Sequence, residues 1–198
     1  MNVVFDLGGV VVAWNPDDIV ARAFPDPDHR ALVKREIFGH PDWLALDRGS
    51  ASVDDVIVRA ARRTGLPELV VRSFIENVPS ALIADREVVD LIRRLKSAGN
   101  SLYCLSNMPT TSMEHLERTY EFWHLFTGMV VSSRVGVCKP EREIYAHLLE
   151  THDLRASDTV FIDDTVANLD AAERFGIRTI HFVGVRQCEG ELRRLGCL

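Results

Sequence analysis

The chain has 198 residues, of which 46% are hydrophobic and 26% charged, and 29 Asp and Glu against 23 Lys and Arg give it a net charge of −6. This length allows one or two domains whose buried core needs no disulfide or structural metal. The acidic balance excludes a general nucleic-acid binder, and no apolar run reaches the roughly 18 residues of a membrane-spanning helix. We therefore expect neither a nucleic-acid partner nor a membrane partner.

The first predicted element is a short buried strand, Val3–Phe5, which stops at Asp6 and is followed by Gly8 and Gly9. Residues 14–77 then show helical patterns and no convincing strand. The expected helical segments are Asp17–Phe24, Asp28–Phe38, a segment around Trp43, Ser52–Thr64 and Pro67–Asn77. Such a run of helices after a first strand predicts a helical subdomain placed over a sheet.

From residue 78 onward, short apolar runs alternate with helical patterns. The expected strands are 101–105, 129–131, 159–162 and 179–183, and the expected helices are 85–98, 141–150 and 167–175. The helix over 85–98 is the clearest, because its apolar residues lie on one face and Gly99 follows as a stop signal. Alternation of this kind predicts an α/β fold with a parallel sheet covered on both faces.

Polar residues follow four of the predicted strands, at the edge where an open α/β sheet binds its ligands. In chain order they are Asp6, Ser106-Asn107, Lys139-Pro140, and Asp163-Asp164 with Asn168. Each one alone is typical of an ordinary turn or helix cap. The adjacent acids are more informative, because neighbouring carboxylates repel each other unless a cation or a helix N-terminus compensates them. Their occurrence together indicates one site.

This order of motifs resembles the haloacid dehalogenase-like (HAD) superfamily of aspartate-nucleophile hydrolases. The matching segments are Phe5–Val10, Leu105–Asn107, Lys139-Pro140 with Ile144-Tyr145, and Asp163-Asp164 with Asn168. Within the superfamily, the chain looks most similar to bacterial sugar-phosphate phosphatases of the α-glucose-1-phosphate phosphatase type and to the N-terminal phosphatase domain of mammalian soluble epoxide hydrolases. The resemblance implies a Rossmann-like core formed by residues 1–13 and 78–198, with an inserted helical cap over 14–77.

The resemblance also implies an activity, which is hydrolysis of a small phosphorylated metabolite, such as a sugar phosphate, by a monomer or homodimer. Asp6 would attack phosphorus and form an aspartyl-phosphate. Ser106 and Asn107 would bind the phosphoryl oxygens, and Lys139 would neutralise the charge on nucleophile and phosphate.

A magnesium cofactor is implied as well, since Mg²⁺ prefers oxygen ligands. Its protein ligands would be Asp6, Asp164 and the backbone carbonyl of Gly8. Asp163 would contribute to catalysis without binding the metal itself, by orienting water or Lys139. Asn168 would position metal-bound waters or the motif loop.

The sequence departs from the family pattern at Gly8, where most phosphatases of the superfamily have a second Asp. That residue acts as general acid for the leaving group and then as base for water, a contribution typically worth about 10²–10⁴-fold in rate. The residue that replaces it is not evident from the sequence. A sugar 1-phosphate would depend less on this general acid, because its anomeric oxygen is a better leaving group than a simple alkoxide.

Trp14 and Arg48, in or near the inserted helices, are the candidates for contacts with the rest of the substrate. The Asp47-Arg48-Gly49 segment is interpreted either as a loop that reaches the site or as a solvated loop. Two other functions stay open. A metal-independent 2-haloacid dehalogenase-type hydrolase would also lack the second Asp, but it needs no cation site at Asp163-Asp164. A catalytically weak HAD-fold binding protein is supported by Gly8 alone.

The cysteines and the N-terminus predict where the protein works. Cys104, Cys138, Cys188 and Cys197 form no CxxC pair, and the seven histidines form no pair at metal-ligand helical spacing. The first residues show no signal peptide. Both observations favour a reducing, cytoplasmic location. Cys138 is interpreted as a buried structural cysteine, with a reactive thiol beside Lys139 as the alternative.

Overall fold

The computed structural model describes residues 1–198, and its centre is a five-stranded parallel sheet with the strand order β3-β2-β1-β4-β5. The strands are β1 (Asn2–Phe5), β2 (Ser101–Ser106), β3 (Gly128–Val131), β4 (Thr159–Asp163) and β5 (Arg178–His181). The central strand β1 pairs with both β2 and β4. Its apolar residues are fully buried, as expected for a parallel strand with helices on both faces. The predicted parallel α/β sheet is confirmed.

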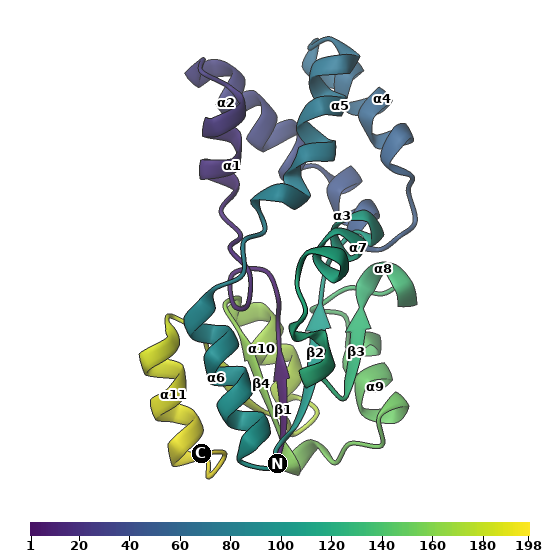
Figure 1. Cartoon of the computed structure of the whole chain (residues 1–198). Coiled ribbons are helices and arrows are strands. Elements are labelled where there is room, and N and C mark those ends of the chain that lie inside the picture. The colour runs from purple at the N-terminus through teal and green to yellow at the C-terminus, as the bar shows by residue number, and fades with distance from the viewer.

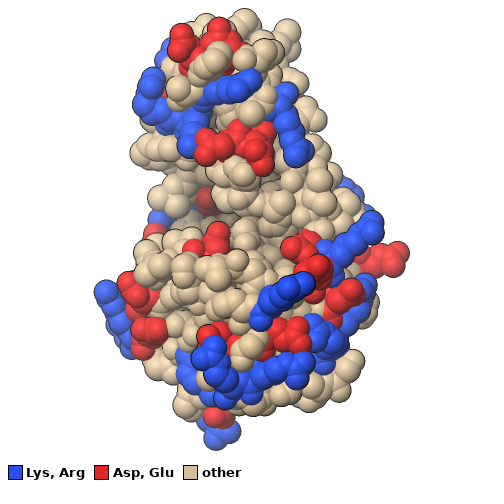
Figure 2. Space-filling model, turned by 90° about the vertical axis from the view of Figure 1, so that its left-hand side faces the viewer, with Lys and Arg blue, Asp and Glu red and all other residues tan.

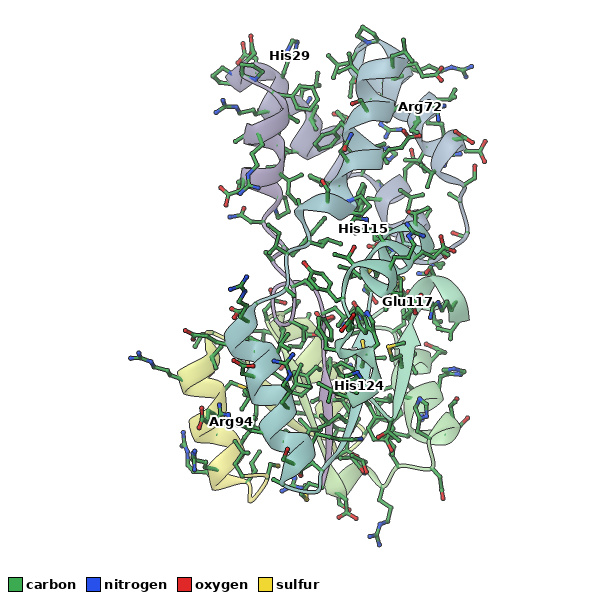
Figure 3. The ribbon with its side chains drawn as sticks, in the orientation of Figure 1. His29, Arg72, Arg94, His115, Glu117 and His124 are labelled. Carbon is green, nitrogen blue, oxygen red and sulfur yellow. The ribbon has the colours of Figure 1, made fainter.

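Helices cover both faces of the sheet (Figure 1). Successive strand residues point to opposite faces, so Val3 and Phe5 share one buried cluster and Val4 belongs to another. The first cluster includes residues of α6 (Arg86–Ser97), α7 (Thr110–Thr119) and α11 (Val185–Arg194), and the second those of α9 (Arg142–Thr151) and α10 (Val166–Glu173). Arg94 on α6, which is labelled in Figure 3, also forms a two-pronged ion pair with Glu189 on α11.

The inserted helices have a hydrophobic core of their own, made of 14 buried residues. They are α1 (Pro16–Ala23), α2 (Pro27–Val33), the π-helical turn η1 (Lys34–Phe38), α3 (Pro41–Asp47), α4 (Val53–Thr64) and α5 (Glu68–Asn77). The 3₁₀ turn η2 (Val78–Ala81) follows them, and its Val78 also belongs to this core. They lie beyond the carboxyl ends of the strands (Figure 1). This separate core supports our proposal that residues 14–77 form a cap.

Polar residues at the helix starts explain where several of these helices begin. The Asn15 side chain accepts hydrogen bonds from the backbone of Asp17 and Asp18 at the start of α1. Ser52 accepts one from the backbone of Asp55 at the start of α4, where the sequence resembles a capping box. None of the helices combines the length and the apolar character that crossing a bilayer requires.

Some elements differ from the sequence-based expectation. The last strand covers 178–181 rather than 179–183, and the expected helix over 28–38 is α2 followed by η1. The sequence analysis did not predict three helices, which are α7, the short α8 (Ser132–Val135) and α11. It also did not predict the 3₁₀ turns η3 (Phe122–Leu125) and η4 (Ala156–Asp158). The reason is clearest in α11, which buries only Cys188 and Leu192. Two apolar residues give too weak a period to recognise.

Candidate active site

The site lies at the carboxyl ends of β1, β2 and β4, which are neighbours in the sheet. A cavity of about 310 Å³ opens there, between the sheet and the inserted helices. On the space-filling surface, the molecule is hollowed between these two parts, and on the face shown basic and acidic side chains are interspersed (Figure 2). The core side of the cavity includes Asp6, Gly8, Asn107, Lys139, Asp164 and Asn168. The cap side includes Trp14, Phe38, Trp43 and Asp47.

Lys139 joins two of the predicted acids. Its Nζ lies 2.8 Å from Asp6 Oδ1 and 2.7 Å from Asp163 Oδ2, and its side chain is only 1% exposed. Burial alone would lower the pKa of the Lys139 ammonium, but the two carboxylates outweigh it and hold that pKa above its usual value. Lys139 is therefore a fixed positive charge beside Asp6.

Asp6 is held in one orientation by donors to a single oxygen. Its Oδ1 accepts hydrogen bonds from Lys139 and from the backbone N–H of Leu7, at 2.7 Å for the latter, while no protein donor contacts Oδ2. Burial raises the pKa of Asp6 to about 7, against the pull of the Lys139 ammonium. The arrangement leaves one carboxylate oxygen available for attack on an electrophile.

Asp163 is fully buried and already accepts hydrogen bonds at both oxygens. Oδ1 accepts from the backbone N–H of Thr165 at 2.8 Å, and Oδ2 accepts from Lys139. Asn168 Nδ2 donates to both oxygens at 3.1 Å, and its own backbone carbonyl accepts from the Tyr145 hydroxyl. Asp163 thus orients Lys139, and the Asn168 amide holds Asp163.

Asp164 differs from its neighbour because it is exposed, and its carboxylate accepts a single hydrogen bond, from the Thr165 hydroxyl at 3.2 Å. The loop after β1 passes close to it. A Cβ at Gly9, where φ is +76°, would lie 2.2 Å from Asp164 Oδ2, so this position requires glycine. At Gly8, φ is not positive, and a Cβ would meet Trp14 at an ordinary 3.6 Å.

The acidic cluster fits a divalent cation. Carboxylate oxygens of Asp6, Asp163 and Asp164 lie within 4.8 Å of one another, and Lys139 compensates only part of their charge. Oxygen ligands of this kind suit Mg²⁺. Because Asp163 already accepts hydrogen bonds at both oxygens, Asp6 and Asp164 are the carboxylates of this cluster that are left to hold an ion.

The two polar residues after β2 have different surroundings. Ser106 is fully buried at the end of β2, its hydroxyl has no hydrogen-bond partner, and it does not itself line the cavity. Leaving such a group unpaired costs about 1–3 kcal/mol, which a bound phosphoryl oxygen would recover. The Asn107 side chain, in contrast, hydrogen-bonds the backbone of Lys139 through both its N–H and its carbonyl groups. It lines the cavity, but its amide is already engaged in positioning Lys139.

Of the two cap candidates, the structure brings only Trp14 to the cavity. Its ring lies 5.4 Å from that of Phe38 and 6.1 Å from that of Trp43, centre to centre, which gives the cavity an aromatic wall. Arg48 does not line the cavity. Its guanidinium pairs with Glu141, with Nη1 donating to Oε2 at 2.8 Å, and so links the cap to the core.

The sequence analysis missed one acid of the cavity, Asp47, at the end of α3. Burial raises the pKa of Asp47 to about 7, and the negative charge of Asp6 contributes to the rise. The available signal was the Asp47-Arg48-Gly49 segment. The loop does reach the site, but with its acid rather than with its arginine.

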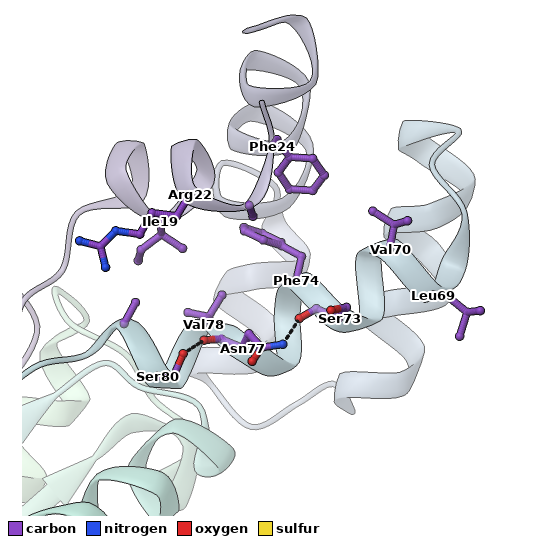
Figure 4. A pocket seen from close by; sticks show the side chains of 12 residues that line it. Ile19, Arg22, Phe24, Leu69, Val70, Ser73, Phe74, Asn77, Val78 and Ser80 are labelled. Atoms are coloured by element: carbon purple, nitrogen blue, oxygen red, sulfur yellow. Dashed lines mark hydrogen bonds between the residues drawn. The ribbon is translucent and has the colours of Figure 1, made fainter. Parts of the chain in front are cut away.

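Cys138 and a cavity among the inserted helices stand apart from this site. Cys138 is 1% exposed, and burial raises the pKa of its thiol, which agrees with a structural cysteine. A cavity of about 540 Å³ lies among the inserted helices, lined by apolar residues such as Phe24, Leu69 and Phe74 (Figure 4). Its lining includes no acid, so it lacks a carboxylate that could act as nucleophile or hold a cation.

Comparison with known proteins agrees with this geometry. Residues 1–176 match the family model described as haloacid dehalogenase-like hydrolase, and the chain belongs to this family of hydrolases. It is 31% identical to the sesquiterpene phosphatase astK of Aspergillus oryzae, over 98% of this chain and 96% of that protein. It is also 37% identical to the bifunctional epoxide hydrolase 2 of Rattus norvegicus, over 87% of this chain and 30% of the rat protein.

A solved structure shares the fold. The HAD family enzyme BT-2542 of Bacteroides thetaiotaomicron, as the wild-type protein in complex with magnesium and inorganic phosphate, superimposes with a TM-score of 0.72. The match covers 90% of this chain and 92% of the other, at 20% sequence identity. The predicted membership of the HAD superfamily, and with it the hydrolase class, is confirmed.

Proposed function

We propose that this hydrolase is a magnesium-dependent phosphomonoesterase that forms an aspartyl-phosphate on Asp6. The observation that carries the proposal is the buried Asp6–Lys139–Asp163 network, which presents Asp6 and Lys139 to the cavity. Asp6 Oδ2 attacks phosphorus, and the Lys139 ammonium offsets the charge that gathers on the phosphoryl oxygens. The Ser106 hydroxyl donates to one of those oxygens.

The cation has a defined place in this proposal. Asp6, Asp164 and the Gly8 carbonyl would hold Mg²⁺, which when bound neutralises phosphoryl charge and orients the group. The magnesium and inorganic phosphate bound to BT-2542 support this assignment by analogy of fold. The free carboxylate of Asp164 supports it independently, because the residue has no ion-pair partner in the chain.

The cavity wall favours a substrate with an apolar or ring-shaped body. Its hydrophobic residues are Trp14, Phe38, Trp43, Val78, Leu82 and Met108. Aromatic faces suit both the C–H face of a sugar and an isoprenoid chain. The name of the Aspergillus relative supports a phosphorylated sesquiterpene alcohol, and a sugar phosphate remains the second candidate.

The two alternative functions have less support. A metal-independent dehalogenase has no use for an exposed second acid such as Asp164, beside which the chain places Gly9 at a positive φ. A binding protein without activity has no need to keep the nucleophile in a charged, largely buried network with Lys139 and Asp163.

The proposal is tested by phosphate release from a panel that includes farnesyl phosphate, glucose 1-phosphate and p-nitrophenyl phosphate, with Mg²⁺ and with EDTA. We expect magnesium-dependent release that Asp6→Asn abolishes, since an amide is a poor nucleophile. Asp90→Asn, at an exposed position of α6, is the matched control and should keep full activity. Turnover by Asp6→Asn above a trace, or equal rates in EDTA, would contradict the mechanism.

A further inference from the structure

Position 8 carries no side chain, so the proposed reaction lacks a proton donor at the usual place. Three acids line the cavity, namely Asp6, Asp47 and Asp164. The first is the nucleophile, and the last has a role as cation ligand. Asp47 alone is uncommitted, because its half-buried carboxylate makes no hydrogen bond or ion pair with the rest of the chain.

The segment that carries Asp47 is fixed to the core at three successive residues. The Ser132 hydroxyl donates to the backbone carbonyl of Asp47 and accepts from the backbone N–H of Met108 at 2.9 Å. Arg48 pairs with Glu141. Gly49, at a φ of +73°, lies so close that a Cβ there would be 2.4 Å from the Ser133 carbonyl oxygen. A loop docked this closely can hold a side chain in a reproducible position.

We propose that Asp47 is the general acid and base of this site, supplied by the cap in place of the carboxyl that Gly8 lacks. The inference rests on the proposed phosphatase function. As Asp6 Oδ2 bonds to phosphorus, the bond from phosphorus to the leaving oxygen breaks, and the Asp47 carboxyl gives that oxygen its proton. Water then attacks the aspartyl-phosphate and loses a proton to the Asp47 carboxylate. Phosphate leaves, and both aspartates return to their initial states.

The surroundings of Asp47 suit this double role. Burial raises its pKa to about 7, the Asp6 carboxylate adds to the shift, and the Lys139 ammonium opposes it. Asp164 lines the same cavity, and the loop also carries Arg48, which pairs with Glu141 and lies near Cys138. A carboxyl with a pKa near the working pH is effective both as acid and as base.

The test compares leaving groups in single-turnover experiments with enzyme in excess and saturating Mg²⁺. For Asp47→Asn, we expect the rate with glycerol 3-phosphate to fall about 100-fold. The rate with p-nitrophenyl phosphate should fall only several-fold, because nitrophenolate leaves without a proton. The wild-type rate with glycerol 3-phosphate should decline above pH 7, and Asp47→Asn should not show this decline. Asp42→Asn, the same change on the same helix but outside the cavity, should keep the wild-type ratio between the two substrates.

A rescue makes the role of the proton specific. Adding Gly8→Asp to the Asp47→Asn variant should raise its rate with glycerol 3-phosphate at least tenfold. Should Asp47→Asn fold poorly by thermal unfolding, Asp47→Ala with added formate replaces it, and formate should restore the same substrate selectively. An equal loss on both substrates, with the high-pH decline retained, would overturn the role of Asp47. That result would leave the proposed function intact. The proposed function itself fails if the wild-type protein releases no phosphate, or if the Asp6→Asn variant still releases phosphate.

Discussion

The side-chain amide of Asn107 holds the backbone of Lys139 from both sides: Nδ2 donates to the Lys139 carbonyl at 2.9 Å, and Oδ1 accepts from the Lys139 N–H at 2.8 Å. The two residues are 32 positions apart in the chain, and the pair connects the loop after β2 to the loop before α9. Lys139 therefore has two anchors, one at its backbone and one at its ammonium group. Its charge is placed by residues from several strands, which is how a preorganised electrostatic site is built.

Asn107→Asp tests the backbone anchor. The carboxylate keeps the acceptor but loses the donor, and it brings an oxygen against the Lys139 carbonyl. We expect kcat to fall by about 10²-fold or more and the Tm to drop by several degrees. Asn77→Asp, on the exposed surface of α5, is a control for the same chemical change. Activity of Asn107→Asp close to that of the wild type would show that the Lys139 position does not depend on this amide.

The second prediction separates the adjacent acids Asp163 and Asp164. Asp164→Ala should weaken Mg²⁺ binding strongly in titration calorimetry, because it removes a free carboxylate. Asp163→Ala should weaken it less and should instead lower the Tm, since it leaves Lys139 and Asn168 without their shared partner. Equal Mg²⁺ affinities in the wild type and both variants would contradict the ligand assignment.

The sheet and the order of the site motifs could be predicted because each depends on short stretches of chain. The strand before Asp6 is a continuous apolar run, and the helix over 86–97 has a clear apolar face. Asp47 could not be identified in this way, because its place in the cavity depends on Ser132, 85 residues away. The loop-like Asp47-Arg48-Gly49 segment is a local signal, but it does not show which of its residues enters the cavity. The same limit led to the expectation that Arg48 contacts the substrate, whereas the structure pairs it with Glu141.

Gly8 and Gly9 are predicted to respond differently to substitution. Gly8→Ala should fold and keep Mg²⁺ affinity, because its Cβ would meet Trp14 at an ordinary 3.6 Å and its carbonyl is retained. Gly9→Ala combines a φ of +76° with a contact of 2.2 Å to Asp164. It should therefore lower the Tm and weaken Mg²⁺ binding. Thermal unfolding and calorimetry check both, and the expectation is wrong if Gly8→Ala is the more damaging change.

The pair between Arg48 and Glu141 gives a further prediction. If Arg48 acts by docking the Asp47 loop, Glu141→Gln should reproduce the effect of Arg48→Ala, and the double variant should add little more. The coupling energy in a double-mutant cycle on stability should be about 0.5–1 kcal/mol, because both side chains are about one-third exposed. A rise in KM specific to Arg48→Ala, absent in Glu141→Gln, would instead support direct substrate contact.

The raised pKa of Asp47 also predicts how stability depends on pH. Its folded-state value of about 7 lies above the ordinary 3.8, so between pH 4 and pH 7 the native state binds the extra proton. The contribution of the Asp47 carboxyl to the free energy of unfolding is therefore fully present below pH 4 and is lost as the pH rises through 7. Asp47→Asn, which cannot ionise, should match the wild type at pH 4 and should be more stable at pH 8.

The expected gain at pH 8 is roughly 1–2 kcal/mol, after discounting for the partial exposure of Asp47, or a few degrees in Tm. The measurement is thermal unfolding in EDTA at both pH values. Asp42 provides a control of opposite sign. Burial alone would raise the pKa of Asp42, but Arg63 and Arg59 outweigh it and lower that pKa. Asp42→Asn should therefore destabilise the protein more at pH 8 than at pH 4. If Asp47→Asn lost stability at pH 8 as Asp42→Asn does, the carboxylate of Asp47 would be a stabilising ion in the cavity rather than a group held near its protonated form.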